Sequence, residues 1–184
     1  TMNKLILGGL RAPEDIAQDV LEDCFLPHDI TGDDAIWFGQ EVARAWVAKL
    51  KDEKTWPAET DVDKLDSAFA ELRAAGIIAL HQAGMEPSDG LTEVSEEYEA
   101  AGAEASGVTG YCFYHQQDVE RAIEGHGLLI AFGDIDGDPV KGVEIGRRVA
   151  RAIEQSGLQP SWDGSIDRCI GVDLRWQKRY RQLT

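Results

Sequence analysis

The chain has 184 residues and a formal net charge of −16, with 34 acidic and 18 basic side chains. A chain of this length can form one complete hydrophobic core with a helical extension. Its 43% hydrophobic and 28% charged residues are typical of a globular protein and not of a disordered one. A surface with this much negative charge repels phosphate backbones and anionic lipids. No apolar run approaches the ~20 residues that are needed to span a bilayer. We therefore expect neither nucleic-acid nor membrane binding.

The cysteines indicate a reducing compartment. Cys24, Cys112 and Cys169 are odd in number and far apart, and no Cys-x-x-Cys pair occurs. This pattern argues against a zinc knuckle and against a disulfide framework. The apolar run at residues 5–10 is too short for the hydrophobic region of a signal peptide. We therefore expect a cytoplasmic protein with free thiols.

Most of the negative charge lies in the first hundred residues. Residues 1–100 hold 22 acidic and 8 basic side chains, a balance of −14. Residues 101–184 hold 12 acidic and 10 basic side chains, a balance of −2. An acidic half of this kind keeps a protein soluble or attracts a basic protein partner.

The first 76 residues predict three helices, because apolar residues recur there near the helical period of 3.6. Proline at a first helical position, aspartate at an N-cap and glycine after a C-terminus are ordinary boundary signals. The start and stop signals are Pro13 and Pro27 for the first helix, Asp33 or Asp34 and Trp56-Pro57 for the second, and Asp63 and Gly76 for the third.

From Ile77 onward, short apolar runs alternate with helical patterns. Strands are expected at 77–81, 110–115, 127–133 and 158–162, and helices are expected after Gly90, at 117–124 and from Asp138-Pro139 to Ser156. Strands separated by helices usually pair in parallel through right-handed crossovers. The run at 128–132 is apolar throughout, as expected for a strand that is covered on both faces.

The C-terminal segment predicts a hairpin. Asp163-Gly164 fits a two-residue turn, and the strand after it alternates, with one side formed by Ile166, Arg168, Ile170, Val172, Leu174 and Trp176. The expected fold is a mixed, mostly parallel five-stranded sheet with flanking helices, of the α+β or α/β class, and an N-terminal three-helix layer. We place a helical region at 1–61 and an α/β domain with this hairpin at 62–184.

Three segments resemble an uncharacterised bacterial family, a domain of unknown function. They are Ala79-Leu80-His81-Gln82-Ala83-Gly84, Gly110-Tyr111-Cys112-Phe113-Tyr114-His115-Gln116-Gln117-Asp118 and Trp162-Asp163-Gly164-Ser165. The resemblance covers roughly residues 63–176 and leaves the N-terminal helices largely outside. It implies no activity, cofactor or site residue.

Polar residues stand where the apolar runs end. If the runs are parallel strands, their carboxyl ends share one edge of the sheet, where open α/β sheets bind ligands. His115 is followed by the opening of a short helix, whose free N–H groups favour an anion or a polar group. The candidate ligand-binding residues are His81, His115, Gln117, Asp118 and Asp134.

Several alternatives remain open for these residues. His81, His115 and Asp118 could hold zinc or iron, but the spacing His-x33-His-x2-Asp matches no known metal signature. Both histidines could instead satisfy local backbone groups. The aspartates at 134–138 resemble a calcium loop, but Pro139 and Ile145 stand where that loop needs glycine and glutamate. We assign no metal ligand and no cofactor.

Two functions of different classes follow from this pattern. The first is an acidic cytoplasmic protein that acts through an interaction with a basic protein partner. The alternative is a small ligand- or metal-binding protein, or a hydrolase, that uses a crevice around His81, His115, Asp118 and Asp134. A pocket shared by His81 and His115 would favour the alternative.

Overall fold

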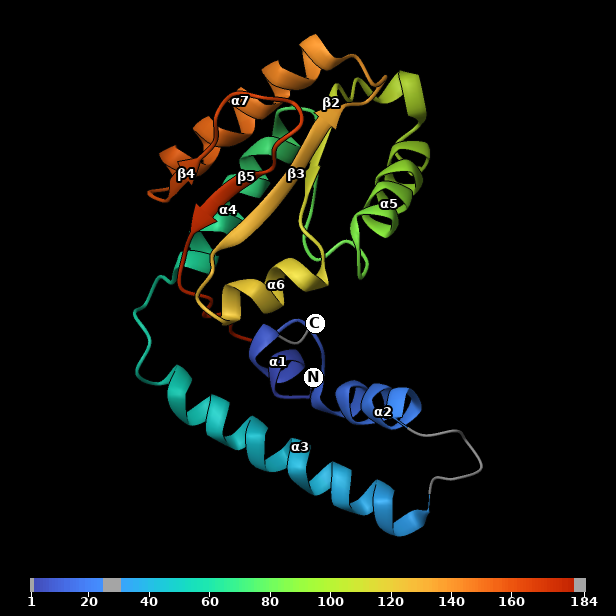
Figure 1. Ribbon diagram of the computed structural model, residues 1–184, viewed down its shortest axis with the longest axis vertical. Helices are drawn as coiled ribbons and strands as arrows, with labels where there is room; N and C mark the ends of the chain where they lie inside the picture. The colour runs from blue at the N-terminus through green and yellow to red at the C-terminus, as the bar shows by residue number, and fades with distance from the viewer. Residues whose placement is uncertain (1, 25–30, 181–184) are drawn as a thin grey trace. The chain divides into compact units, whose positions relative to one another are not determined.

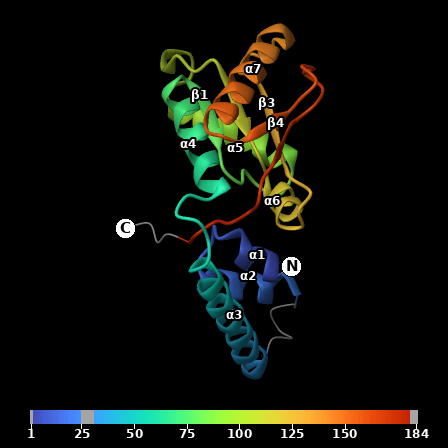
Figure 2. The same cartoon turned by 90° about the vertical axis from the view of Figure 1, so that its left-hand side faces the viewer.

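The computed structural model describes residues 2–24 and 31–180 (Figures 1 and 2). The chain divides into two compact units. Residues 61–176 form one unit, and the residues up to 60 together with those from 177 onward form the other. No helix in the described ranges is long and apolar enough to cross a membrane.

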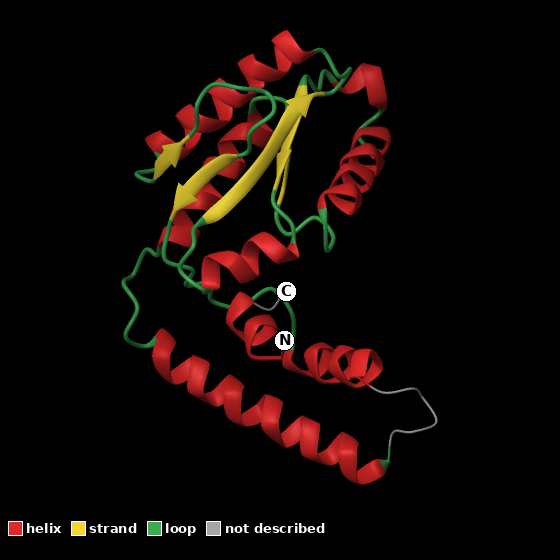
Figure 3. Cartoon of the chain, viewed as in Figure 1, coloured by secondary structure: helices red, strands yellow, loops and turns green. Residues whose placement is uncertain are grey.

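The first unit consists of helices (Figure 3): α1 (Met2–Gly8), α2 (Pro13–Cys24) and α3 (Gly32–Glu53). Its core is formed by the buried side chains of Ile6, Ile16, Val20 and Val42. The C-terminal segment returns to this unit, where the buried Lys49 ammonium donates a hydrogen bond to the Lys178 carbonyl at 2.8 Å. The sequence predicted α2 and α3 but not α1, and the predicted helix end at Pro27 lies outside the described residues.

The start of α3 is fixed by a capping box. The Thr31 hydroxyl accepts from the Asp34 N–H at 3.2 Å, and the Asp34 carboxylate accepts from the Thr31 N–H at 3.0 Å. The N-cap is therefore Thr31, and not Asp33 or Asp34 as predicted. Both acidic residues still lie in the first turn, where they complement the positive end of the helix dipole.

The second unit is a sheet with helices on both faces (Figure 1). In chain order its elements are α4 (Asp61–Ala74), β1 (Ile77–Leu80), α5 (Pro87–Ala100), η1 (Ala103–Ser106), β2 (Gly110–Phe113), α6 (Gln116–Ile123), β3 (Leu128–Asp134), α7 (Pro139–Gln155), β4 (Gln159–Ser161) and β5 (Ile170–Asp173). The strand order is β1-β2-β3-β5-β4. Helices α4 and α7 cover one face, and α5 lies against the other (Figures 1 and 2).

The prediction of a mostly parallel sheet is wrong. Among the described strands only β1 and β2 pair in parallel, while β3 runs antiparallel to both β2 and β5, and β4 is antiparallel to β5. Helix α6 connects the end of β2 to the start of β3, and β3 then runs back along β2, with Phe113 opposite Ala131 and Gly110 opposite Asp134. A helix between two strands therefore does not by itself fix parallel pairing.

The predicted C-terminal alternation is confirmed from Ile170 onward, since Ile170, Val172, Leu174 and Trp176 are all buried. The predicted two-residue turn is wrong, because the chain between β4 and β5 spans residues 162–169. The Trp162 indole N–H donates to the carbonyls of Ser165 at 2.9 Å and Arg168 at 3.2 Å. These hydrogen bonds hold a longer loop.

Candidate functional site

The carboxyl ends of β1 and β2 lie side by side, as their parallel pairing requires. Two backbone hydrogen bonds continue the pairing beyond the strands, from the Ala83 N–H to the Tyr114 carbonyl at 2.8 Å and from the Gln116 N–H to the Gly84 carbonyl at 3.0 Å. His81 and His115 therefore follow neighbouring strands at one edge of the sheet, as predicted for this strand pair.

The His81 ring turns toward α4. It stacks on Phe69 with ring centroids 4.6 Å apart, and its Nδ1 lies 2.9 Å from the Tyr114 hydroxyl. Its Nε2 lies 3.7 Å from an Asp66 carboxylate oxygen. Burial, and after it the Asp66 charge, raises the pKa of Tyr114 well above its ordinary value, so the phenol keeps its proton. When this hydroxyl donates to Nδ1, the Nε2 proton faces Asp66, and both ring nitrogens have partners.

The His115 side chain lies at the N-terminus of α6. Its Nδ1 is 3.2 Å from an Asp118 carboxylate oxygen, and the same oxygen accepts from the His115 backbone N–H at 3.1 Å. Burial raises the pKa of Asp118, although the His115 N–H, the His115 ring and Arg121 all favour its charged form. Asp118 therefore caps the first turn of α6 through the His115 N–H, and its carboxylate lies beside the imidazole.

The exposed thiol of Cys169 belongs to the electrostatic surroundings of Asp118. Desolvation, and after it the Asp118 charge, raises the pKa of the Cys169 thiol. A thiol whose pKa is raised is mostly protonated at neutral pH and is a weak nucleophile. The arrangement of His115, Asp118 and Cys169 therefore does not provide an activated cysteine for hydrolysis.

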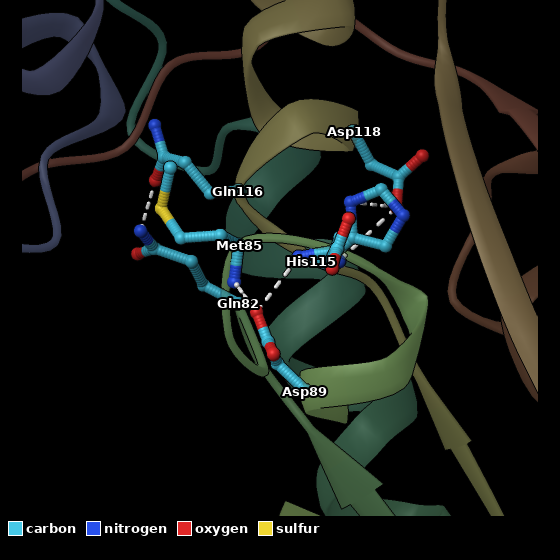
Figure 4. A network of polar contacts seen from close by, with 7 residues as sticks. Gln82, Met85, Asp89, His115, Gln116 and Asp118 are labelled. Atoms are coloured by element: carbon cyan, nitrogen blue, oxygen red, sulfur yellow. Dashed lines mark hydrogen bonds and ion pairs between the residues drawn. The ribbon is translucent and has the colours of Figure 1, made fainter. Parts of the chain in front are cut away.

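A second polar network adjoins His115 (Figure 4). The Gln82 side-chain amide donates to the Gln116 side-chain oxygen, and the amide of the buried Gln116 lies 3.4 Å from Glu120. Gln82 has a φ of 51°, a left-handed conformation that is uncommon for a residue other than glycine. The sequence indicated the histidines as candidates because they are polar residues at the ends of apolar runs. It did not indicate Gln82 or Gln116, because neither glutamine belongs to a catalytic or metal-binding motif.

The loop after β1 is closed by Asp89. Its carboxylate accepts from the backbone N–H groups of Met85 at 3.0 Å and Glu86 at 3.2 Å (Figure 4). Gly84 has a φ of +64°, and a Cβ on this residue would lie 2.1 Å from the Asp89 Cβ. Glycine is therefore required where the loop folds back on α5.

The placement of Asp134 at the same edge is wrong. Asp134 pairs with Gly110, the first residue of β2, and so lies at the opposite end of the sheet from His81 and His115. Its carboxylate accepts from the N–H groups of Asp136 and Asp138, each at 3.1 Å, and orders the turn before α7. The error follows directly from the reversed direction of β3.

His81 contacts Phe69 and Tyr114, whereas His115 contacts Asp118. Neither histidine lines any of the cavities described below. Gln117 is exposed on α6. Across the residues that the structure describes, no three His, Cys, Asp or Glu side chains are placed to hold a metal ion.

A groove lies elsewhere in this unit, along the outer edge of β1. It has a volume of about 180 Å³ and is bordered by α4 and α5. Its lining residues are Arg73, Gly76, Ile77, Ile78, Ala79, Leu80, Glu97, Ala101 and Val108. Because β1 is the last strand on this side of the sheet, the groove follows a strand edge that no other described strand covers.

The outward side of α5 is acidic. No lysine or arginine occurs between Arg73 and Arg121, a stretch that holds nine acidic residues. Partial desolvation, followed by the charges of Asp136, Glu104 and Glu99, raises the pKa of Tyr98. Across the described chain, no ion pair involves the carboxylates that we call the α5 acidic face, namely Glu93, Glu96, Glu97, Glu99 and Glu104.

Two further grooves are open. One, of about 500 Å³, lies between α7 and β4 and is lined in part by Arg147, Arg151 and Trp162. The other, of about 430 Å³, lies between α2 and α3 in the helical unit and is almost entirely apolar.

Comparison with known families places the chain in one of them. Residues 1–180 match the model of a family described as a domain of unknown function (DUF6891), and the chain belongs to that family. The match includes the N-terminal helices, which the resemblance from sequence left outside. Neither a curated protein nor a solved structure matches the chain.

Proposed function

We propose that this protein binds a basic, extended segment of a protein partner along the edge of β1. The observation that carries the proposal is the position of the groove, between the outer edge of β1, with which no other described strand pairs, and the α5 acidic face. Its wall includes Glu97, which belongs to that face. An extended segment in the groove would gain backbone hydrogen bonds from the strand and charge attraction from the helix.

The backbone of β1 supplies the hydrogen bonds. The Arg73 guanidinium donates to the Ala79 carbonyl at 2.9 Å, which places that carbonyl on the outer side of β1. Since backbone groups alternate along a strand, Ile77 also directs its N–H and C=O outward. A strand edge without a partner strand is a template for an added strand. Ile77 and Ala79 are each only 2% exposed, so a bound segment has to displace the side chains that cover this edge, Arg73 among them.

The charge of the surroundings selects the partner. The five carboxylates of the α5 acidic face carry one sign of charge, and one of them, Glu97, lines the groove. No ion pair within the described residues neutralises them. Complementary charge speeds encounter and rejects partners of the wrong sign. A segment rich in lysine and arginine is therefore favoured over an acidic one.

Arg73 gives the proposal a specific consequence. An incoming strand has to replace the Arg73 guanidinium at the Ala79 carbonyl, and the arginine repels a basic segment. Arg73→Gln should therefore strengthen binding of a basic peptide.

The test uses fluorescence anisotropy with short peptides in which lysines or arginines alternate with valines, and with acidic peptides of the same length. We expect the triple variant E96Q/E97Q/E99Q to weaken binding of the basic peptide about tenfold or more, and R73Q to strengthen it. The matched control E154Q/D167N/D173N removes the same charge elsewhere in the unit and should change the affinity less than about twofold. Equal losses in both triple variants, or no binding of basic peptides to the wild type, would overturn the proposal.

Ligand binding at the network of Figure 4 is the second candidate function. The observation in its favour is the left-handed backbone of Gln82, because strained residues outside glycine concentrate at functional sites. A thermal-shift screen of small anions and polar metabolites against wild type and His115→Ala tests it. A ligand that stabilises the wild type but not a folded His115→Ala variant supports this function, and an unfolded variant shows that His115 is structural.

A further inference from the structure

We propose that the exposed side of α3 is the contact surface between two copies of this chain, paired antiparallel about Ala43. This surface lies in the helical unit and is independent of the proposed peptide groove. The observation behind it is the exposure of large apolar side chains on one helix: Ile36 at 61%, Trp37 at 55%, Val47 at 66% and Leu50 at 43%. A monomeric protein rarely leaves such residues grouped in water.

The spacing of these residues places them on one line. Ile36, Ala43, Val47 and Leu50 are separated by 7, 4 and 3 positions, so they lie within about 40° of a single stripe along the helix. We call these four residues the α3 stripe. This spacing is that of a coiled-coil seam. The buried Val42 faces the core of the unit instead, so the stripe is additional to the face that α3 already uses.

The apolar groove between α2 and α3 adjoins the stripe. It has a volume of about 430 Å³, and its wall includes Gly39, Ala43 and Val47 as well as Pro13 and Ala17. The small residues Gly39 and Ala43 allow a second helix to approach closely near the middle of α3. In an antiparallel pair about Ala43, Val47 of the second copy lies opposite Gly39, and its apolar side chain suits the polarity of this groove.

The charges along α3 identify the occupant as a second copy. The first turn carries Asp33 and Asp34. The last turn and the C-cap carry Lys51 and Lys54, together with Asp52 and with Glu53, which forms an ion pair with the buried Lys49. In an antiparallel pair centred on Ala43, Ile36 of one copy lies opposite Leu50 of the other. The same arrangement brings Asp33 between Lys51 and Lys54, which lie near the stripe, whereas Asp52 lies on the side of the helix away from it. A two-fold pair is thus complementary at both ends, which a parallel pair is not.

The middle of the helix does not oppose this pairing. Arg44 and Glu41 form an ion pair within the helix at 2.7 Å, so the charges nearest the proposed two-fold axis are already balanced. Trp37 flanks the stripe and packs edge-to-face on Phe38 with ring centroids 4.9 Å apart. An aromatic residue in this position is typical of interface hot spots.

The first experiment measures mass in solution by sedimentation velocity over a range of micromolar concentrations. The wild type should sediment as a dimer, and Val47→Glu should raise the dimer dissociation constant about a hundredfold while leaving the circular dichroism spectrum unchanged. The control Val140→Glu changes an equally exposed valine on α7, at 75% exposure, and should leave the dimer intact. A wild type that remains a monomer, or a dimer that tolerates Val47→Glu, would overturn the proposal.

The second experiment tests the antiparallel register by exchanging charges. Asp33→Lys alone and the double variant K51E/K54E should each weaken the dimer about tenfold, because like charges then face each other. The triple variant D33K/K51E/K54E restores opposite signs and should recover most of the affinity at low salt. All three positions are exposed, and circular dichroism checks that α3 stays folded when the charges at its ends are reversed. Failure of the triple variant to recover, or co-sedimentation with a different protein in place of a second copy, would refute this pairing.

Discussion

The two thiols of the sheet unit differ in their surroundings. Burial raises the pKa of the Cys112 thiol to about 12, whereas Cys169 is exposed. Because the thiolate is the reactive form, iodoacetamide at pH 8 should modify Cys169 and spare Cys112 in the folded protein. Peptide mapping by mass spectrometry checks this site by site. Both residues should react equally in urea, and modification of Cys112 without denaturant would show that the centre of the sheet opens readily.

Asp118 should make stability depend on pH. Burial raises its folded pKa, so its contribution favours folding at pH values below the unfolded value near 4 and is lost as the pH rises through the folded value. Asp118→Asn keeps an acceptor for the His115 N–H and removes the ionisation. Its free energy of unfolding relative to wild type should therefore increase from about pH 3 to pH 5.5.

Urea titrations at a series of pH values measure this difference. The exposed Asp167→Asn serves as the control and should show no such trend. A relative stability of Asp118→Asn that falls over the same range would contradict the assignment.

At the scale of single residues, strand order could be predicted better than side-chain direction. His81 and His115 could be assigned to one edge because each ends an apolar run and the two runs pair in parallel. The stacking of His81 on Phe69 depends on where α4 packs, which no local pattern specifies. Asp134 was misplaced because an apolar run carries no information about the direction of its strand.

At the scale of elements, the contact between α5 and the sheet depends on one glycine. A Cβ on Gly90 would lie 2.2 Å from a ring carbon of Phe113, a residue that is fully buried and cannot move aside easily. Gly90→Ala should lower the free energy of unfolding by about 1–3 kcal/mol through overpacking. Urea denaturation, monitored by circular dichroism, measures this change in the free energy of unfolding.

A matched control is available in α3. Gly39 is also helical, but no heavy atom lies within 4 Å of the position where its Cβ would be. At protein concentrations too low for the proposed dimer to form, Gly39→Ala should therefore stabilise the protein by about 0.5–1 kcal/mol, since alanine favours the helix. Similar effects of both substitutions would mean that α5 can shift away from Phe113.

Elements with strong end signals could be predicted, and those without them could not. Asp138 caps α7 through hydrogen bonds from the Val140 and Lys141 N–H groups, and Pro139 begins the helix, as the sequence indicates. Helix α1 has only 7 residues, so its periodicity is too short to recognise. The direction of β3 depends on how the chain returns after α6, which no local preference specifies.

At the scale of the whole molecule, the net charge of −16 should make stability respond to salt. Repulsion among like charges acts within about 8–10 Å at physiological ionic strength and further at low salt. The melting temperature should therefore rise between low salt and physiological salt. Calorimetry measures the melting temperature. Equal increases in sodium chloride and in potassium chloride would show that the effect comes from ionic strength and not from one bound cation. A flat or falling curve would mean that the carboxylates are already neutralised.

The helical unit contains both ends of the chain, and the sheet unit is inserted between them. The Arg175 N–H donates to the Asp61 carboxylate at 3.1 Å, so the chain enters and leaves the sheet unit at adjacent points. A segment with adjacent ends is a module that can be removed or transplanted without stretching its host. Residues 61–176 expressed alone should therefore fold cooperatively, which urea denaturation can measure. Residues 1–60 rejoined to 177–184 by a few glycines and serines should regain their helical circular dichroism signal. The helical unit would then be a host domain, and the sheet unit a domain inserted into it.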